Sequence, residues 1–595
     1  MAFKYYALVC GGTGCESSKA DDIYKNLVRE SELQGVQGDV QVVKTGCFGF
    51  CEQGPIVKVL PDESFYVQVV PEDAKEIISE HIVKGREVDR LVYKAGDTDA
   101  RPKFEDIEFY QKQFRVVLRN CGLIDPDNID EYIARDGYMA LEKVLFELSP
   151  DDVIEELKKS QLKGRGGAGF PTWLKWNFTK KAEGDQKYVV CNADEGDPGA
   201  YMDRSTLEGD PHSLLEAMAI AGYTIGANEG YIYIRAEYPI AINKLKKAMI
   251  DAREYGLLGK DILGSGFDFD IEIRLGAGAF VCGEETALLA SIEGERGMPI
   301  PRPPFPSVKG LWRKPTLINN VETWANIPVI INNGGDWFAK IGTETSKGTK
   351  VFALTGKINN SGLVEVPMGT TLREIVYDIG GGIPGGKEFK AVQTGGPSGG
   401  VITAEYLDTP IDYENLKELG SIMGSGGMIV MDEDDCMVDV SKFYLGFCVD
   451  ESCGKCAPCR VGGRTLYNIL DRLTKGVGEM DDIDKMKRIG RAMQKASLCG
   501  LGQTAPNPIL STLKYFEDEY LAHIKDDRCP AGKCKELITY YILPDKCIGC
   551  GVCARRCPVN AITGERRKPH LIDHDLCIKC GECHQACKFD AVMVR

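Results

Sequence analysis

The sequence predicts a multidomain α/β protein, and three observations support this fold class. Its 595 residues exceed the length of about 300 at which a single core stops growing. Its 23 cysteines fall mainly into closely spaced groups near both ends and in the second half of the chain. The middle carries two glycine-rich loops beside short predicted strands and helices. We therefore expect several domains, each with its own site.

The composition is that of a globular chain, with 43% hydrophobic and 27% charged residues and no apolar run long enough to span a bilayer. The net charge of −16 argues against nucleic acids and anionic membranes as partners, because their phosphates need a basic surface. The first ten residues lack the apolar core and cleavage site of a signal peptide. Tightly grouped cysteines in such a chain indicate metal binding in a reducing compartment, so we expect a cytoplasmic protein.

The amino-terminal segment carries two pairs of cysteines, each placed after a predicted strand. Residues 6–9 and 40–43 are the apolar runs, and the pairs that follow them are Cys10 with Cys15 and Cys47 with Cys51. Two loops at strand ends could bring four thiolates together. The x4 and x3 spacings are wider than the zinc x2 knuckle, although zinc remains the alternative. Residues 94–105 are charged and predict a linker. Arg101 precedes Pro102, which favours an extended backbone where the chain crosses to the next domain.

Residues 164–171 (GRGGAGFP) form the first glycine-rich loop. Four glycines in six residues let the backbone approach a ligand and aim N–H groups at phosphate oxygens. The dinucleotide fingerprint G-x-G-x-x-G needs a strand before it and a helix after it. Here residues 151–162 predict an amphipathic helix before the loop, and Pro171 follows at once. This context favours a flavin or nucleotide cradle of another design over an ordinary Rossmann loop, with a plain surface loop as the alternative.

Two further segments resemble parts of ligand sites in α/β folds. Residues 187–192 predict a short buried strand, and Asn192-Ala-Asp-Glu195 follows at its end, where such folds place binding loops. Residues 276–294 predict a second glycine loop that runs into a helix ending at Gly294. Glu284 and Glu285 in the first turn suit the helix dipole. Three isolated cysteines are expected in the core: Cys121, Cys191 and Cys282.

Taken together, residues 110–503 resemble the flavoprotein subunit of respiratory complex I and its relatives in NAD-linked hydrogenases and formate dehydrogenases. The resemblance implies FMN and NAD(H), with Phe170, Phe178 and Phe305 around the adenine ring. It implies that Glu285 contacts the nicotinamide ribose region. The cofactor-binding residues that it implies are Gly164, Arg165, Gly166, Gly167, Gly169, Phe170, Lys175, Phe178, Asn192, Asp194, Glu195, Gly283, Glu284, Glu285, Phe305, Asn319, Asn320 and Thr323.

Glu285 and Asp197 are the candidate catalytic residues. Asp197 stands where complex I relatives often have Glu, and a carboxylate near a ribose would favour NAD over NADP by repelling a 2′-phosphate. The sequence shows no Ser-His-Asp, metal-hydrolase or paired-carboxylate constellation. Hydride chemistry would therefore belong to the flavin.

The second half of the chain predicts a bridge followed by a helical cluster domain. Residues 349–402 alternate short β-branched runs with glycine-rich turns and resemble a small ubiquitin-like (SLBB-type) domain. Residues 465–473 and 483–496 have helical periodicity. Three cysteines at x2 spacing and a distant fourth supply the thiolates of a [4Fe-4S] cube more readily than a zinc site: Cys453, Cys456, Cys459 and Cys499.

An internal repeat at residues 547–557 and 577–587 has the pattern of a two-cluster ferredoxin, in which the fourth cysteine of each run serves the other cube. One cube is expected on Cys547, Cys550, Cys553 and Cys587, and the other on Cys577, Cys580, Cys583 and Cys557. Before the repeat, His523, Cys529 and Cys534 could bind zinc or, less favoured, a further cluster. The fourth ligand would be Cys448 or Cys436, and two ordinary thiols in a linker are the alternative.

The amino-terminal module is similar to thioredoxin-like [2Fe-2S] ferredoxins, which completes the predicted organisation. We expect a thioredoxin-like domain at 1–90, a linker at 91–118, a modified Rossmann-like FMN and NAD domain at 119–345 and a ubiquitin-like domain at 346–430. A helical bundle with [4Fe-4S] and zinc would occupy 431–535, and a two-cluster ferredoxin domain 536–595. The expected cofactors are FMN, NAD(H), one [2Fe-2S], three [4Fe-4S] and zinc.

This order of domains is most similar to the beta subunit of NAD-linked [FeFe]-hydrogenases, including electron-bifurcating ones. The resemblance implies hydride exchange between NAD(H) and FMN, and single electrons passing through clusters to or from a hydrogenase catalytic subunit and ferredoxin. It also implies a small [2Fe-2S] subunit as a partner. A flavoprotein subunit of formate dehydrogenases and a non-catalytic electron-wiring scaffold are the alternatives.

Overall fold

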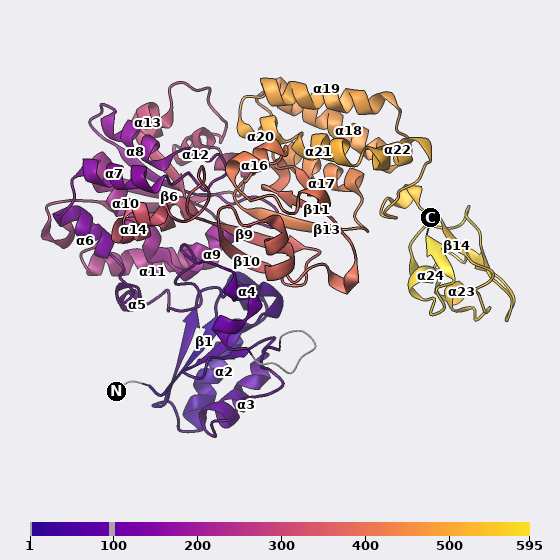
Figure 1. Ribbon diagram of the computed structural model, residues 1–595, viewed down its shortest axis with the longest axis horizontal. Coiled ribbons are helices and arrows are strands. Elements are labelled where there is room, and N and C mark those ends of the chain that lie inside the picture. The colour runs from indigo at the N-terminus through magenta and orange to yellow at the C-terminus, as the bar shows by residue number, and fades with distance from the viewer. Residues whose placement is uncertain (1–2, 95–101, 595) are drawn as a thin grey trace. The chain divides into compact units, whose positions relative to one another are not determined.

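The computed structural model describes residues 3–94 and 102–594, and its elements are labelled in Figure 1. It divides into two compact units, one made of Met1–Lys387 with Ala391–Val430 and the other of Glu388–Lys390 with Met431–Arg595. In the predicted linker at 94–105, residues 95–101 lie outside the described residues, and with them the Arg101 crossing. Across the described ranges, we find no helix with both the length and the apolar character needed to cross a bilayer.

The first unit begins with a small α/β module. Its four strands are β1 (Tyr5–Cys10), β2 (Val40–Thr45), β3 (Val57–Leu60) and β4 (Ser64–Tyr66), in the order β2-β1-β3-β4. β1 runs parallel to β2 and antiparallel to β3. The long helix α2 (Ala20–Leu33) connects β1 to β2 and buries Ile23 and Leu27. The strands expected at 6–9 and 40–43 are confirmed.

The centre of the first unit is a four-stranded parallel sheet. Its strands are β5 (Tyr188–Ala193), β6 (Glu229–Arg235), β7 (Asp270–Gly276) and β8 (Thr316–Asn320), in the order β7-β6-β5-β8. A parallel sheet must be covered on its faces, and the chain supplies helices from its crossovers and from the segments before β5 and after β8. They include α7 (Pro150–Ser160), α8 (Thr172–Lys181), α9 (Met202–Gly209), α10 (Pro211–Ile225), α11 (Pro239–Glu254), α12 (Glu285–Ile292) and α14 (Val321–Asn333).

Helix α10 is the inner layer of this arrangement. It is apolar around most of its circumference and nearly every residue is buried, as expected for a helix surrounded by others. It packs against α8, α11, α14 and α6 (Met139–Phe146). The shared core includes the indoles of Trp176 and Trp324, which are fully buried. The strand expected at 187–192 and the helix expected at 151–162 are confirmed as β5 and α7.

A second sheet follows the parallel one. It contains β9 (Thr349–Gly356), β10 (Gly362–Pro367), β11 (Phe389–Thr394), β12 (Val401–Thr403) and β13 (Gly427–Asp432), in the order β10-β9-β13-β11-β12. β10 and β9 are antiparallel, whereas β13 and β9 are parallel. The sheet therefore agrees with the β-rich character expected from residues 349–402.

The second unit consists of a helical bundle and a small module. The bundle contains α17 (Met437–Asp450), α18 (Gly463–Thr474), α19 (Asp481–Ala496), α20 (Gly500–Thr504), α21 (Asn507–Tyr515) and α22 (Glu517–Lys525). It confirms the helices expected at 465–473 and 483–496. In the small module, β14 (Tyr540–Ile542) pairs with β17 (Val592–Val594) and β15 (Ile562–Thr563) with β16 (Leu571–Ile572). Its short helices α23 (Val552–Arg556) and α24 (Glu582–Gln585) pack together, one from each half of the repeat.

Candidate flavin site and metal-binding cysteines

The first glycine loop closes on itself and lies against the end of β8. The Gly164 amide donates to the Phe170 carbonyl at 2.8 Å, and the Arg165 amide donates to Thr323 Oγ1 at 2.8 Å. A helix, not a strand, precedes the loop, as expected. A helix also follows it, because α8 begins at Thr172 directly after Pro171, and this corrects the expectation that Pro171 separates the loop from a helix.

The glycines of this loop fall into two classes. Gly167 and Gly169 have φ of 110° and 64°, a conformation that side chains disfavour, and a Cβ on Gly169 would lie 2.7 Å from the Tyr413 ring. Packing therefore accounts for them. At Gly164, by contrast, an added Cβ would meet no atom closer than 3.5 Å, and the same holds at Gly283 in the second glycine loop. A side chain would fit at both positions, so packing within the chain does not require glycine at either.

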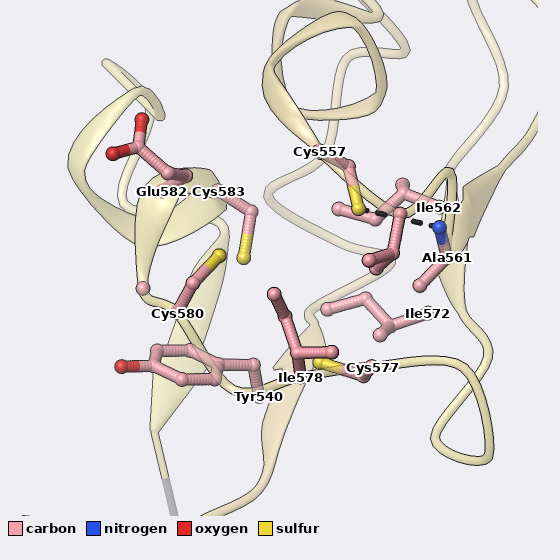
Figure 2. Close-up of a pocket in the computed structure, with 12 residues that line it drawn as sticks. Tyr540, Cys557, Ala561, Ile562, Ile572, Cys577, Ile578, Cys580, Glu582 and Cys583 are labelled. Carbon is pink, nitrogen blue, oxygen red and sulfur yellow. Dashed lines mark hydrogen bonds between the residues drawn. The ribbon is translucent and has the colours of Figure 1, made fainter.

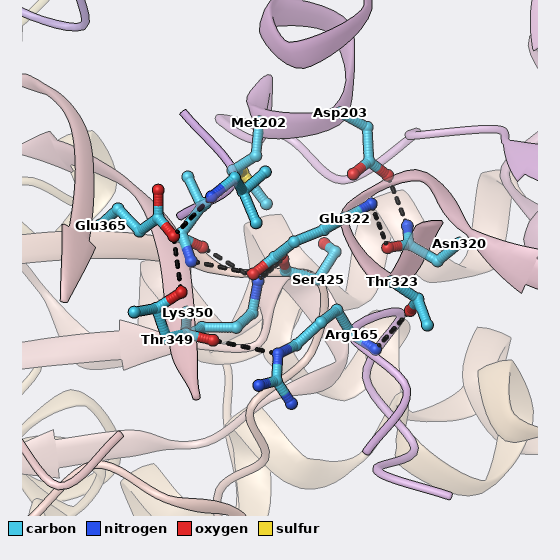
Figure 3. A network of polar contacts seen from close by, with 12 residues as sticks. Arg165, Met202, Asp203, Asn320, Glu322, Thr323, Thr349, Lys350, Glu365 and Ser425 are labelled. Carbon is cyan, nitrogen blue, oxygen red and sulfur yellow. Dashed lines mark hydrogen bonds and ion pairs between the residues drawn. The ribbon is translucent and has the colours of Figure 1, made fainter. Parts of the chain in front are cut away.

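The Arg165 side chain is an internal anchor of the loop. It is fully buried, and its guanidinium donates to the carbonyls of Thr349 at 3.0 Å, Lys163 at 2.9 Å and Lys347 at 2.6 Å. Figure 3 shows Arg165 reaching toward Thr349. Any ligand contact of this residue would come from its backbone.

The predicted asparagines gather at the carboxyl ends of β5 and β8. Asn192 Nδ2 donates to the Gly283 carbonyl at 2.8 Å, which joins the NADE segment to the second glycine loop. Asn320 Nδ2 donates to Asp203 Oδ2 at 2.5 Å, and Asn320 also caps α14. Gly166 lies against Asn320, so the first glycine loop reaches the same edge. Three segments far apart in the sequence thus meet where parallel strands end. Asn319 points elsewhere, toward the buried indole of Trp176.

Glu195 and its neighbour Asp194 form internal contacts. The Glu195 carboxylate accepts from the amides of Asp203 at 3.0 Å and Arg204 at 3.1 Å at the start of α9. It is 5% exposed, and burial raises its pKa. Asp194 Oδ1 lies 3.5 Å from Arg235 Nη1. Glu195 therefore ties the NADE loop to α9.

Glu285 lies in a cluster of charges. Its Oε2 is 3.3 Å from Lys175 Nζ and its Oε1 is 2.6 Å from Arg302 Nη1. Burial alone would raise the pKa of Glu285, but the two cations outweigh it and the pKa is lowered. Its neighbour Glu284 accepts from two amides at the start of α12, which stops before Gly294 as expected. Arg302 was not predicted, because an arginine 17 residues after Glu285 has no spacing signal.

Three aromatic rings named by the resemblance are solvent-accessible. Phe170 is 44% exposed, Phe178 47% and Phe305 54%. The Arg302 guanidinium lies 5.8 Å from the centroid of Phe305. Rings exposed to this degree can stack on a planar ligand at low desolvation cost.

Asp197 faces the second sheet. Its Oδ2 accepts a hydrogen bond from Ser425 Oγ at 2.6 Å, and Gly396 packs against its carboxylate. Burial raises the pKa of Asp197 to about 6. Its carboxylate thus has a partner within the chain.

A buried ion pair joins α14 to β9, and Figure 3 shows it among its neighbours. Lys350 and Glu322 contact each other with 0% and 2% of their side chains exposed. Lys350 Nζ also donates to the Ser425 carbonyl at 2.6 Å. Nearby, the Glu365 carboxylate accepts from the amides of Val116, Val117 and Leu118, each at 2.9 Å. These contacts fix the second sheet to the flavin region, and no spacing pattern predicts them.

The amino-terminal cysteines come together from two loops. A Cβ on Gly54, three residues after Cys51, would lie 2.8 Å from Cys15 Sγ, and a Cβ on Gly12 would lie 3.1 Å from Cys47 Sγ. The thiol of Cys10 hydrogen-bonds with Cys15 and Cys47, and the bond to Cys15 together with burial raises its pKa. The four thiols therefore form one group at the end of β1.

The candidate ligand cysteines of the second unit form four groups, two of them in the small module. Cys459 lies beside Cys453 and Cys456, and burial together with their charges raises its pKa. Gly502, close to Cys499 in sequence, would place a Cβ 2.9 Å from Cys459 Cβ. In the small module, one pocket contains four thiols, which Figure 2 shows around Tyr540 and Ile578: Cys557, Cys577, Cys580 and Cys583. Burial and the charges of Cys547, Cys550 and Cys587 raise the pKa of Cys553. The neighbours in the two small-module groups are those of the crossed assignment, which stays a prediction.

The remaining group has the geometry of a compact metal site. The ligand atoms of Cys436, His523, Cys529 and Cys534 all lie within 4.8 Å of one another, and all four residues are buried. His523 Nε2 is 3.5 Å from Cys436 Sγ and 3.4 Å from Cys534 Sγ. His523 Nδ1 lies 2.7 Å from the Glu519 carbonyl, which leaves Nε2 available as the ligand atom. Of the two candidates for the fourth ligand, the structure places Cys436 in the group.

Comparisons with known families agree with these sites. Family models match residues 3–81 (thioredoxin-like [2Fe-2S] ferredoxin) and 157–329 (Nuo51 FMN-binding domain). They also match residues 439–523 (NADH-ubiquinone oxidoreductase-F iron-sulfur binding region) and 538–591 (4Fe-4S dicluster domain). The predicted thioredoxin-like, FMN-binding and 4Fe-4S regions are confirmed, and so are FMN, NAD(H) and iron-sulfur clusters as cofactors.

Whole proteins match over most of the chain. The NADP-reducing hydrogenase subunit HndC of Solidesulfovibrio fructosivorans is 62% identical over 483 residues, 81% of this chain and 98% of that protein. The F 2 subunit of the NADH-quinone oxidoreductase of Rhizobium meliloti is 46% identical over 415 residues, 70% of this chain and 99% of that protein. A crystal structure of NAD+-reducing [NiFe]-hydrogenase in the H2-reduced state is 28% identical, with a TM-score of 0.62, covering 88% of this chain and 85% of its own.

Proposed function

Because this chain belongs to the family of complex I flavoprotein subunits, we propose that it exchanges a hydride between NAD(H) and FMN and passes single electrons to a catalytic partner. The observation that carries the proposal is the meeting of both glycine loops and the NADE segment at one sheet edge. At this edge neither Gly164 nor Gly283 is required by packing within the chain, since an added Cβ would meet nothing closer than 3.5 Å. Glycine at such positions lets a ligand approach the backbone N–H groups closely.

The side chains around this edge suggest how a nicotinamide cofactor would be held. FMN, when bound, accepts electrons in pairs and releases them one at a time, which matches one-electron clusters. Glu285 is held as an anion by Lys175 and Arg302, so it can accept hydrogen bonds from ribose hydroxyls. Backbone amides of the glycine loops can bind phosphate oxygens. Phe170, Phe178 and Phe305 offer exposed rings for the adenine.

Asp197 bears on the choice between NADH and NADPH. We propose NAD(H), because a carboxylate at this position would repel a 2′-phosphate. HndC, which is described as NADP-reducing, makes NADPH the competing cofactor. Asp197 engages Ser425, and this contact shortens its reach toward a ligand.

The cysteine groups support the rest of the electron path. We assign one [2Fe-2S] to the amino-terminal group, one [4Fe-4S] to the Cys459 group and two to the small module. We assign zinc to the compact site around His523, since a set of three thiols and one imidazole suits it. We also retain the ubiquitin-like assignment for residues 346–430 and the domain limits given above.

The proposed partners are a hydrogenase-type catalytic subunit of the [FeFe] class, a small [2Fe-2S] subunit and ferredoxin, with electron bifurcation between NAD(H) and ferredoxin. Support comes from the order of domains and from the hydrogenase relatives. Grouped thiols suit a reducing compartment, and we place the protein in the cytoplasm.

The test is anaerobic reconstitution of the full chain. We expect about one FMN per chain, and faster reduction of a viologen dye with NADH than with NADPH. Copurification should recover a catalytic subunit, and the complex should evolve or consume H2 and leave formate unchanged. A reconstituted chain that retains iron but no FMN would contradict the proposal and favour an electron-wiring scaffold. Formate turnover would favour a formate dehydrogenase.

A further inference from the structure

Helix α9 joins the candidate flavin edge to the amino-terminal cysteines within the first unit. Its first amides bind the carboxylate of Glu195, at 3.0 Å from Asp203 and 3.1 Å from Arg204. Glu195 belongs to the NADE segment at the end of β5. The start of the helix is therefore fixed to the loop that would line the flavin.

The same helix contacts each cysteine-bearing segment of the amino-terminal module. Thr13, between Cys10 and Cys15, donates through its amide to Glu208 Oε2 at 3.1 Å. Gly46, just before Cys47, lies so close to Gly209 that a Cβ on Gly46 would be 2.3 Å from Gly209 Cα. Tyr201, at the N-cap of α9, donates from its hydroxyl to Cys51 Sγ at 3.5 Å. One helix thus fixes the position of all the thiol loops.

The Tyr201 ring is held in place. The Arg204 guanidinium lies 5.5 Å from its centroid, a cation–π distance, and also 5.4 Å from the ring of Tyr238. Arg204 is itself fixed through its amide by Glu195. The hydroxyl is therefore aimed at Cys51 by contacts that lead back to the flavin edge.

We propose that the Tyr201 hydroxyl raises the reduction potential of the [2Fe-2S] cluster by donating a hydrogen bond to the Cys51 sulfur. The proposal rests on the [2Fe-2S] assignment made above. Reduction adds one electron, and the extra negative charge is shared with the ligand sulfurs. A donor bonded to such a sulfur stabilises the reduced cluster more than the oxidised one, so the potential becomes more positive. Tyr201 is a positioning and tuning residue, since it acts through Cys51.

The test is an anaerobic redox titration of the full chain, monitored by the electron paramagnetic resonance of the [2Fe-2S] cluster. Tyr201→Phe keeps the ring over Arg204 and removes the donor. We expect the equilibrium constant for reduction to fall about three- to tenfold, a shift of about 30 to 60 mV to more negative potential at about 59 mV per decade. Water entering the vacated space would restore part of the bond, so tenfold is the upper limit.

Tyr110→Phe is the matched control. Tyr110 is buried in the same part of the unit, and its hydroxyl bonds the Phe48 carbonyl at 3.2 Å. Arg115 Nη2 also donates to that carbonyl at 3.0 Å, so the variant leaves the oxygen paired. We expect its potential to match that of the unmodified chain, and an equal shift in both variants would overturn the proposal.

A second measurement begins with the unmodified chain. After exchange into D2O, the unmodified chain should show an exchangeable deuteron coupled to the reduced cluster in pulsed resonance spectra. Tyr201→Phe should weaken the coupling of the hydroxyl deuteron, whereas the coupling of the Gly49 amide, which donates to Cys47 Sγ at 3.3 Å, should remain. Absence of the hydroxyl coupling from the unmodified chain, or an unshifted potential in a Tyr201→Phe protein with a normal cluster signal, would overturn the inference. If the unmodified chain shows no [2Fe-2S] signal after reconstitution, the cluster assignment itself fails.

Discussion

Replacing Cys436 with Ala should abolish tight metal binding at the compact site of the second unit. The replacement leaves three of the four ligands, Cys529, Cys534 and His523. Removing a residue that only hydrogen-bonds to a metal ligand weakens metal binding by about 10- to 100-fold. Loss of a direct ligand should therefore weaken binding by at least about 100-fold, or about 2.7 kcal/mol at about 1.36 kcal/mol per decade.

Cys448→Ala provides the control. Cys448 lies on α17 in the same core and is as buried as Cys436, with 1% of each residue exposed. The measurement is the zinc content per chain by mass spectrometry, with iron counted separately, after dialysis against chelators of increasing affinity. The reasoning is refuted if Cys436→Ala retains zinc like the unmodified chain, or if Cys448→Ala loses it to the same extent.

Three further predictions concern the first unit. Glu285→Gln should slow NADH oxidation at least about tenfold while FMN stays bound, measured by dye reduction and flavin absorbance; loss of FMN would show that the role is misassigned. Lys350→Met leaves the Glu322 carboxylate buried without its ion pair and should lower the free energy of unfolding by about 3–5 kcal/mol, whereas the exposed Lys357→Met should change it little in thermal denaturation. Burial raises the pKa of Asp197 to about 6 from 3.8, so the folded chain binds this proton more tightly than the unfolded chain does. The contribution of Asp197 to the free energy of unfolding should therefore fall by about 3 kcal/mol as the pH rises from about 4 to about 6. The melting temperature of D197N relative to the unmodified chain should accordingly rise over that interval and level off above it; a difference independent of pH would count against this account.

The positions of the cysteines could largely be predicted from spacing. The crossed pattern of the repeat anticipated that Cys557 would join Cys577, Cys580 and Cys583, because tetrahedral sulfur ligation restricts short loops to few arrangements. Spacing could not choose between Cys436 and Cys448. That choice depends on which residue faces α22 at the start of α17, a tertiary contact that local pattern does not encode.

The flavin region shows more clearly what sequence patterns do not predict. Spacing located the glycine loops. It could not separate Gly169, required by a positive φ and the Tyr413 ring, from Gly164, where an added Cβ would clash with nothing. The family resemblance placed Arg165 and Glu195 among the cofactor-binding residues, whereas their charged groups bind backbone atoms of the chain itself. Buried ionic groups of this kind pair across long sequence separations, so adjacent residues give no sign of them.

The anchoring of Arg165 determines how short a flavin-binding fragment of this chain can be. Two of the three carbonyls that hold its guanidinium belong to Lys347 and Thr349, beyond the end of the matched FMN-binding segment at residue 329. A fragment truncated there would leave the buried guanidinium with only the Lys163 carbonyl as an acceptor and would weaken the anchoring of the loop. During synthesis, FMN should therefore bind only after β9 has left the ribosome. A minimal flavin-binding fragment should extend through the second sheet.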